Sequence, residues 1–97
     1  MSAEPQPANT AEVTLLTQPA CSLCDQAKTV LTALQREGLV TVREVDLTGT
    51  AGRDLAVRHG VLFAPGVLVD GQPFSYGRLS EKKLRRHLAR RTSRAGT

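Results

Sequence analysis

The sequence predicts an α/β domain in which four strands form one mixed sheet with helices on both of its faces. Short β-branched apolar runs alternate with stretches of helical periodicity in the order β-α-β-α-β-β-α. The first strand, the first helix and the second strand follow one another closely, which is typical of a right-handed parallel βαβ unit. Later in the chain, the Asp70-Gly71 pair between two β-like runs predicts an antiparallel hairpin.

The composition is that of an ordinary globular chain, with 40% hydrophobic and 23% charged residues among 97. We expect a flexible leader over residues 1–11, a single domain over residues 12–91 and a flexible basic tail over residues 92–97. The leader lacks the basic start and apolar centre of a signal peptide, and no apolar run reaches membrane-spanning length. Two cysteines are too few for the disulfide scaffold of a small secreted protein. We therefore expect a cytoplasmic protein, a monomer without membrane contact.

The first strand and the first helix meet at the only two cysteines of the chain, Cys21 and Cys24. Residues 13–17 form a short β-branched apolar run, which predicts a buried strand. From about Ser22 to near Gly38, apolar residues that include Cys24 recur at helical spacing. Cys21 is then at the helix N-terminus, where unpaired backbone N–H groups and the positive end of the helix dipole stabilise a thiolate. The pKa of such a thiol can fall from about 8.5 to roughly 3.5–7.5.

A second strand and a short second helix follow. Residues 39–46 alternate in polarity and predict a strand. Its inward-facing positions are Val40, Val42 and Val45. Residues 48–60 predict a loop and then a short helix, with Thr48 or Thr50 as its N-cap and Gly60 at its C-terminus.

The hairpin and the last helix complete the domain. Residues 66–70 and 72–76 are the two arms of the predicted hairpin. Pro73 has no backbone N–H to donate, so the second arm is expected at the edge of the sheet. The last helix is expected to begin after Ser80, a residue type that caps helix N-termini.

Positive charge is concentrated in this last helix. Residues 78–97 carry eight Lys or Arg and one Glu, a net charge of +7, whereas the preceding residues carry five basic and eight acidic groups, a net charge of −3. Such a face is commonly a solvated surface, but it can also bind phosphates or an acidic partner. The aromatic content of 3% leaves little for base stacking, so nucleic acid is not expected as a partner.

Three interpretations are open for the cysteine pair. A zinc site would need four ligands, and only His59 and His87 remain as candidates. The two cysteines could instead be unrelated buried thiols, since free cysteine often behaves as a small core residue. The third interpretation is a reversible dithiol, because residues three apart on a helix have Cβ atoms about 5–6 Å apart, close to disulfide geometry. The strand-turn-helix context favours this redox interpretation.

The order of elements, the Cys21-Ser22-Leu23-Cys24 motif and the Ala64-Pro65 step before a strand resemble the glutaredoxin-like branch of the thioredoxin superfamily. The resemblance covers roughly residues 12–91 and implies a thioredoxin-like fold of the glutaredoxin type. It implies that Pro65 is cis and lies against the dithiol, and that the backbone of Ala64 pairs with an extended substrate. It also implies that the two residues between the cysteines contact the substrate, and that the fold needs no metal or organic cofactor.

The motif differs from the Trp-Cys-Gly-Pro-Cys of thioredoxins and the Cys-Pro-Tyr-Cys of glutaredoxins. Glutaredoxins bind glutathione through a Gly-Gly and an acidic pair that follow the fourth strand. This chain has residues 76–80 at that place, so glutathione is not implied as the substrate.

We therefore expect a thiol-disulfide oxidoreductase in which the Cys21 thiolate attacks a disulfide and Cys24 resolves the mixed disulfide. Its expected partners are a disulfide-containing protein or a low-molecular-weight disulfide, together with a thiol or a reductase that regenerates the dithiol. The alternative function is a redox-inactive thioredoxin-fold binding module that uses the basic C-terminal helix to bind an anionic partner.

Overall fold

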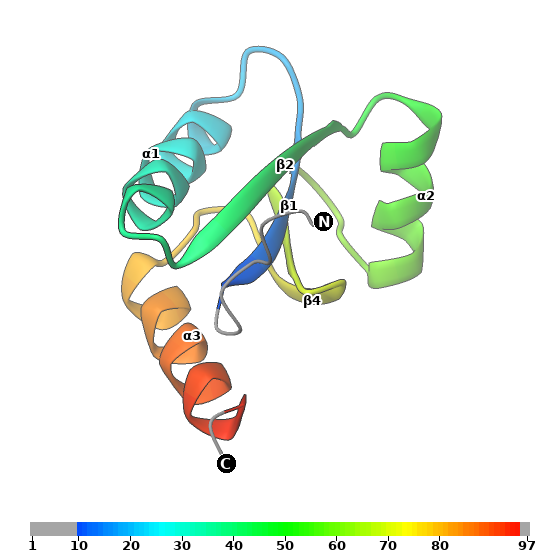
Figure 1. The fold of residues 1–97 in the computed structure, drawn as a ribbon. Helices are drawn as coiled ribbons and strands as arrows, with labels where there is room; N and C mark the ends of the chain where they lie inside the picture. Colours follow the sequence, from blue (N-terminus) through cyan, green and yellow to red (C-terminus); the bar gives the residue numbers. More distant parts are fainter. Residues whose placement is uncertain (1–9, 96–97) are drawn as a thin grey trace, which may run out of the picture.

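The structure, a computed structural model, describes residues 10–95, which form four strands and three helices (Figure 1). In chain order they are β1 (Ala11–Thr17), α1 (Ser22–Arg36), β2 (Val40–Asp46), α2 (Thr50–His59), β3 (Gly66–Val69), β4 (Gln72–Tyr76) and α3 (Glu81–Ala95). This order confirms the β-α-β-α-β-β-α prediction. Residues 1–9, which make up most of the expected leader, and residues 96–97 lie outside the described part of the chain.

The strands form one mixed sheet in the order β2-β1-β3-β4. β1 and β2 are parallel, whereas β3 is antiparallel to both β1 and β4. Gly66, the first residue of β3, is opposite Leu16 of β1 and opposite Tyr76, the last residue of β4. We call this the cysteine end of the sheet, because β1 ends there and the cysteine motif follows β1 in the chain. β4 is at the edge, as Pro73 predicts.

Each face of the sheet has its own apolar core, because helices cover both faces (Figure 1). On one face, Leu15 belongs to the same buried cluster as Leu31 of α1 and Leu84 of α3. On the other face, Leu16 belongs to a smaller cluster with Ala56 of α2. Successive residues of a strand point to opposite faces, which is why the neighbours Leu15 and Leu16 enter different cores.

The inward positions of β2 are divided between these two cores. Val42 packs against the cluster that contains Val40, on the α1 and α3 face. Val45 packs against the α2 cluster. All three side chains are therefore inward, as expected, but they do not share one face of the sheet.

β1 and α3 extend beyond their expected boundaries. β1 begins at Ala11 instead of residue 13, because Ala11 is fully buried and its N–H donates to the Leu39 carbonyl at 3.1 Å. α3 continues to Ala95, beyond the expected start of the tail at residue 92. The Lys83 N–H donates to the Ser80 hydroxyl at 3.1 Å, which confirms Ser80 as the helix cap.

The expected N-cap of α2 is wrong. Gly49 is the N-cap, and no side chain caps the helix. The Thr48 hydroxyl instead donates to the Asp46 carboxylate at 2.6 Å, and the Thr48 N–H donates to the same oxygen at 2.8 Å. Both hydrogen bonds lower the pKa of the Asp46 carboxyl, and the one from the Thr48 hydroxyl has the larger effect. Gly60 ends the helix in a left-handed conformation with φ 69°, as expected.

No helix within residues 10–95 is long and apolar enough to cross a membrane.

Candidate active site

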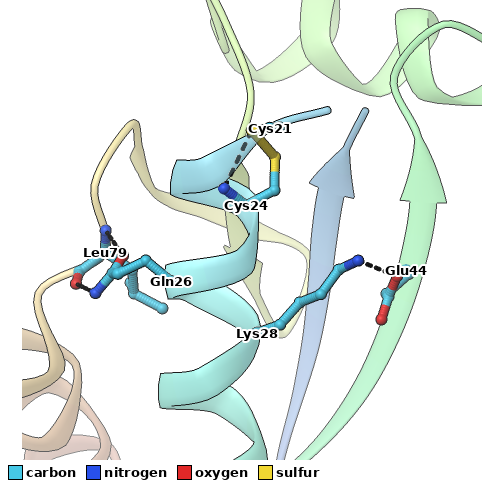
Figure 2. Close-up of a disulfide and its surroundings, with 6 residues drawn as sticks. All are labelled: Cys21, Cys24, Gln26, Lys28, Glu44 and Leu79. Carbon is cyan, nitrogen blue, oxygen red and sulfur yellow. Dashed lines mark hydrogen bonds and ion pairs between the residues drawn. A yellow bond between two sulfur atoms is a disulfide. The ribbon is translucent and has the colours of Figure 1, made fainter. Parts of the chain in front are cut away.

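Cys21 is the N-cap residue of α1, in an extended conformation with φ −124° and ψ 104°. The Cys24 N–H donates to the Cys21 sulfur at 3.1 Å (Figure 2). The Asp25 N–H donates to the Cys21 carbonyl at 3.1 Å. The Cys21 side chain therefore satisfies one of the backbone N–H groups that the first helical turn leaves unpaired. The same N–H would donate to a Cys21 thiolate and stabilise it.

The two cysteines form a disulfide, with their Cα atoms 5.1 Å apart (Figure 2). Cys21 is partly exposed, whereas Cys24 is 1% exposed and shares the buried stripe of α1 with Ala27 and Leu31. The structure therefore places a reachable sulfur and a sheltered sulfur within bonding distance. This arrangement matches the redox interpretation and does not match two unrelated buried thiols.

Neither histidine joins the cysteines. The His87 ring packs on Phe74 with ring centroids 5.2 Å apart, and His59 ends α2. Within residues 10–95, no three His, Cys, Asp or Glu side chains gather in a group that could hold a metal ion.

The Ala64–Pro65 peptide bond is cis, as the resemblance implied. Pro65 is buried, and it precedes Gly66 at the cysteine end of the sheet. The Pro65 carbonyl accepts a hydrogen bond from the Gly77 N–H at 2.8 Å, so the loop before β3 is tied to the segment that follows β4. Ala64 is only 7% exposed.

Several exposed side chains, most of them apolar, belong to the cysteine motif or to segments at the cysteine end of the sheet. Ser22 and Leu23, between the cysteines, are both exposed. Phe63, two residues before Pro65, is 53% exposed and meets the ring of Tyr76 edge-on, with centroids 5.0 Å apart. The sequence gives no signal of this aromatic pair, because the partners come from segments that only the β3–β4 pairing brings together.

Gln26 of α1 is a further residue that sequence reasoning missed. Its amide donates to the Leu79 carbonyl at 2.9 Å, and its side-chain oxygen accepts from the Leu79 N–H at 3.1 Å (Figure 2). Leu79 is 1% exposed, so these bonds satisfy backbone groups that water reaches poorly. The pair fixes the helix that carries the cysteines to the connection between β4 and α3.

An ion pair also connects α1 to β2. The Lys28 ammonium lies 3.6 Å from a Glu44 carboxylate oxygen (Figure 2). Both side chains are about half exposed. Exposed pairs of this kind contribute roughly 0–1 kcal/mol, so the apolar core and not this pair positions the helix.

Comparisons with known proteins agree with the fold and the motif. The profile of one protein family, described as glutaredoxin-like domain (DUF836), matches residues 12–89. A mutant thioredoxin from Halobacterium salinarum NRC-1 has a similar solved structure, with a TM-score of 0.66 and 20% sequence identity over 84% of this chain and 74% of that chain. No curated protein sequence matches the chain. The fold is therefore thioredoxin-like, and a Cys-x-x-Cys pair in this fold indicates redox capacity.

Proposed function

We propose that this chain, which belongs to the glutaredoxin-like domain family, is a thiol-disulfide oxidoreductase that acts through Cys21 and Cys24. One observation carries the proposal: the pair forms a disulfide at the N-terminus of α1, with Cys21 partly exposed and Cys24 buried. A nucleophile must reach an external sulfur, and a resolving thiol must reach only the nucleophile, so this difference in exposure supports Cys21 as the nucleophile and Cys24 as the resolving thiol.

The proposed reaction has two exchange steps. The Cys21 thiolate attacks one sulfur of a substrate disulfide, which breaks the substrate S–S bond, forms a mixed disulfide and releases the other substrate sulfur as a thiolate that takes up a proton. Cys24 then loses its proton and attacks the Cys21 sulfur, which releases the second substrate thiol. Two electrons pass from the dithiol to the substrate, and the Cys21–Cys24 disulfide remains.

The surroundings support substrate binding at this end of the sheet. We propose that Pro65 lies against the dithiol, that the Ala64 backbone pairs with an extended substrate segment, and that Ser22 and Leu23 contact it. Ala64 is nearly buried, so its side chain offers little surface to a substrate. The exchange chemistry uses sulfur alone, and no metal or organic cofactor takes part in it.

Regeneration of the dithiol needs an external reductant. We propose that a small thiol or a reductase supplies the two electrons, and that the protein works as a monomer in the cytoplasm, where thiols are kept reduced.

The test uses reduced protein, a neutral small disulfide and no external thiol. Wild-type protein is expected to release one equivalent of reduced product, and Cys21→Ser is expected to release none, because serine is not ionised at neutral pH. Cys24→Ser is expected to stop as a mixed disulfide on Cys21, which mass spectrometry detects. Full activity in both single variants would contradict the proposal.

The alternative, a redox-inactive binding module, predicts that the wild-type protein releases no product in this assay. The basic face of α3 is present in either case.

A further inference from the structure

A groove of about 460 Å³ lies between β4 and α3. Four exposed cationic side chains line it: Arg78, Lys83, Arg86 and Arg90. Lys83, Arg86 and Arg90 are three and four residues apart, so they share one face of α3.

The groove cations differ from two other arginines of the same helix. Arg85 donates to the Glu37 carboxylate at 2.6 Å and to Glu81 at 2.9 Å, and Arg91 pairs with Asp70. Within the described residues, by contrast, none of the four groove cations has a carboxylate within 4.0 Å. No carboxylate within residues 10–95 pairs with the groove cations, so this part of the chain leaves the groove a positive potential that favours an anionic ligand.

The spacing of these cations suits an extended acidic segment. With a rise of 1.5 Å per residue, Lys83 and Arg86 are about 4.5 Å apart along the helix axis, and Arg86 and Arg90 about 6 Å apart. Alternate side chains of an extended peptide are about 6.6 Å apart. Carboxylates on alternate residues of a bound peptide could therefore each approach a different cation.

The groove leads to the cysteine end of the sheet. Tyr76 lines the groove and contacts Phe63, which precedes the cis proline loop. The next residue, Gly77, is hydrogen-bonded to the Pro65 carbonyl. α3 starts beside α1, through the Gln26–Leu79 contact, and its C-terminal end extends away from the sheet (Figure 1). The Phe63–Tyr76 and Gly77–Pro65 contacts thus connect the groove to the cis proline loop at the cysteine end of the sheet.

We propose that this groove binds an acidic, extended segment of a protein substrate while the disulfide of that substrate reacts at Cys21. The inference rests on the proposed function and names its substrate class. A peptide is favoured over a nucleic acid because the groove leads to a thiol-exchange site, which only a sulfur-bearing molecule can use.

The test compares two synthetic disulfide peptides of equal length and a neutral small disulfide. One peptide carries alternating Glu residues beside its cysteine, and the other carries Gln at those positions. At low salt, wild-type protein is expected to reduce the acidic peptide with a kcat/KM at least about tenfold higher than that for the Gln peptide. This preference should shrink at high salt.

The groove variant carries Lys83→Gln, Arg86→Gln and Arg90→Gln. It is expected to lose the preference for the acidic peptide and to reduce the neutral small disulfide as fast as wild type. The matched control carries Lys82→Gln, Arg53→Gln and Arg58→Gln, three exposed positions that do not line the groove. The control loses the same charge and is expected to keep the preference.

Equal rates on both peptides, or an equal loss in the control variant, would overturn the inference and leave the proposed function intact. Stronger inhibition by a single-stranded oligonucleotide than by a cysteine-free acidic peptide would overturn it as well, in favour of nucleic acid. If wild-type protein reduced none of the three disulfides, the proposed function would fail, and the substrate assignment with it.

Discussion

Gln26 shows how a single side chain can stabilise the candidate site without touching the sulfurs. It makes two hydrogen bonds with the backbone of Leu79, 53 residues away in the sequence. In the sequence, Gln26 is one more polar residue beside the apolar stripe of a helix. The contact arises only when α1 and the β4–α3 connection pack against the same core, so local pattern gives no sign of it.

Replacing Gln26 by Ala is expected to lower the free energy of unfolding by about 1–3 kcal/mol, because the buried N–H and carbonyl of Leu79 lose their partners. Urea unfolding measures this change. Gln35→Ala is the control, since Gln35 is exposed on the same helix. Equal effects of the two substitutions would show that the Leu79 contact contributes nothing.

Among the elements, the β3–β4 hairpin shows best what the sequence predicts and what it does not. Asp70 and Gly71 have φ values of 51° and 81°, as the Asp-Gly turn predicts. The contacts of the turn were not predictable: the Asp70 carboxylate accepts from the Glu12 N–H at 3.0 Å and pairs with Arg91 of α3. They join three elements that are distant in the sequence.

The Asp70 carboxyl gives the hairpin a pH dependence. Burial raises its pKa, but the hydrogen bond from the Glu12 N–H and the Arg91 guanidinium outweigh burial and hold the pKa below 3.8. A depressed folded-state pKa means that the stabilisation is complete above 3.8 and is lost as the pH falls through the lower folded-state value.

Asp70→Asn keeps an oxygen for the Glu12 N–H and a residue type that tolerates positive φ, but it removes the charge. It is expected to destabilise the protein by less than about 1 kcal/mol at pH 7, and the difference from wild type should vanish in strong acid. Unfolding in urea at a series of pH values measures this difference. A stability difference between variant and wild type that stays constant across the pH range would contradict a stabilising role for the Asp70 charge. Asp54→Asn, at an exposed position of α2, is the control.

α2 is the element for which sequence reasoning worked least well. Two threonines predicted its N-cap, but Thr48 binds Asp46 and Gly49 takes that position. Gly52, a poor helix former by propensity, is required because a Cβ there would lie 2.1 Å from the Asp46 carbonyl oxygen. The hydrogen bonds of Thr48 to Asp46 decide the first feature and close packing of the helix on the end of β2 decides the second, and propensity reveals neither.

Gly52→Ala is therefore expected to destabilise the protein by more than about 1 kcal/mol, although alanine is the better helix former. Thermal or urea unfolding checks the sign. Gly49→Ala is the comparison, because its Cβ would have only an ordinary contact at 3.5 Å with the same oxygen. A stabilised Gly52→Ala variant would mean that α2 can move away from β2.

At the scale of the whole molecule, the sequence predicts the topology and the chemical centre but not the surface around it. Periodicity and turn residues are local signals, and they suffice for seven elements in order, for Cys21 at a helix N-terminus and for Cys24 in its buried stripe. The cis state of Pro65 was predicted by the family resemblance. The Phe63–Tyr76 pair and the basic groove depend on how distant segments meet, so only the structure reveals them.

The central claim is that Cys21 is the nucleophile and Cys24 the resolving thiol. The most direct measurement is the rate of alkylation of each cysteine in the reduced, folded protein as a function of pH, read by peptide mapping. Cys21 is expected to react first, with a pKa below the ordinary thiol value of about 8.5, while buried Cys24 reacts much more slowly. Faster alkylation of Cys24, or no reaction of either thiol until the protein unfolds, would contradict the claim.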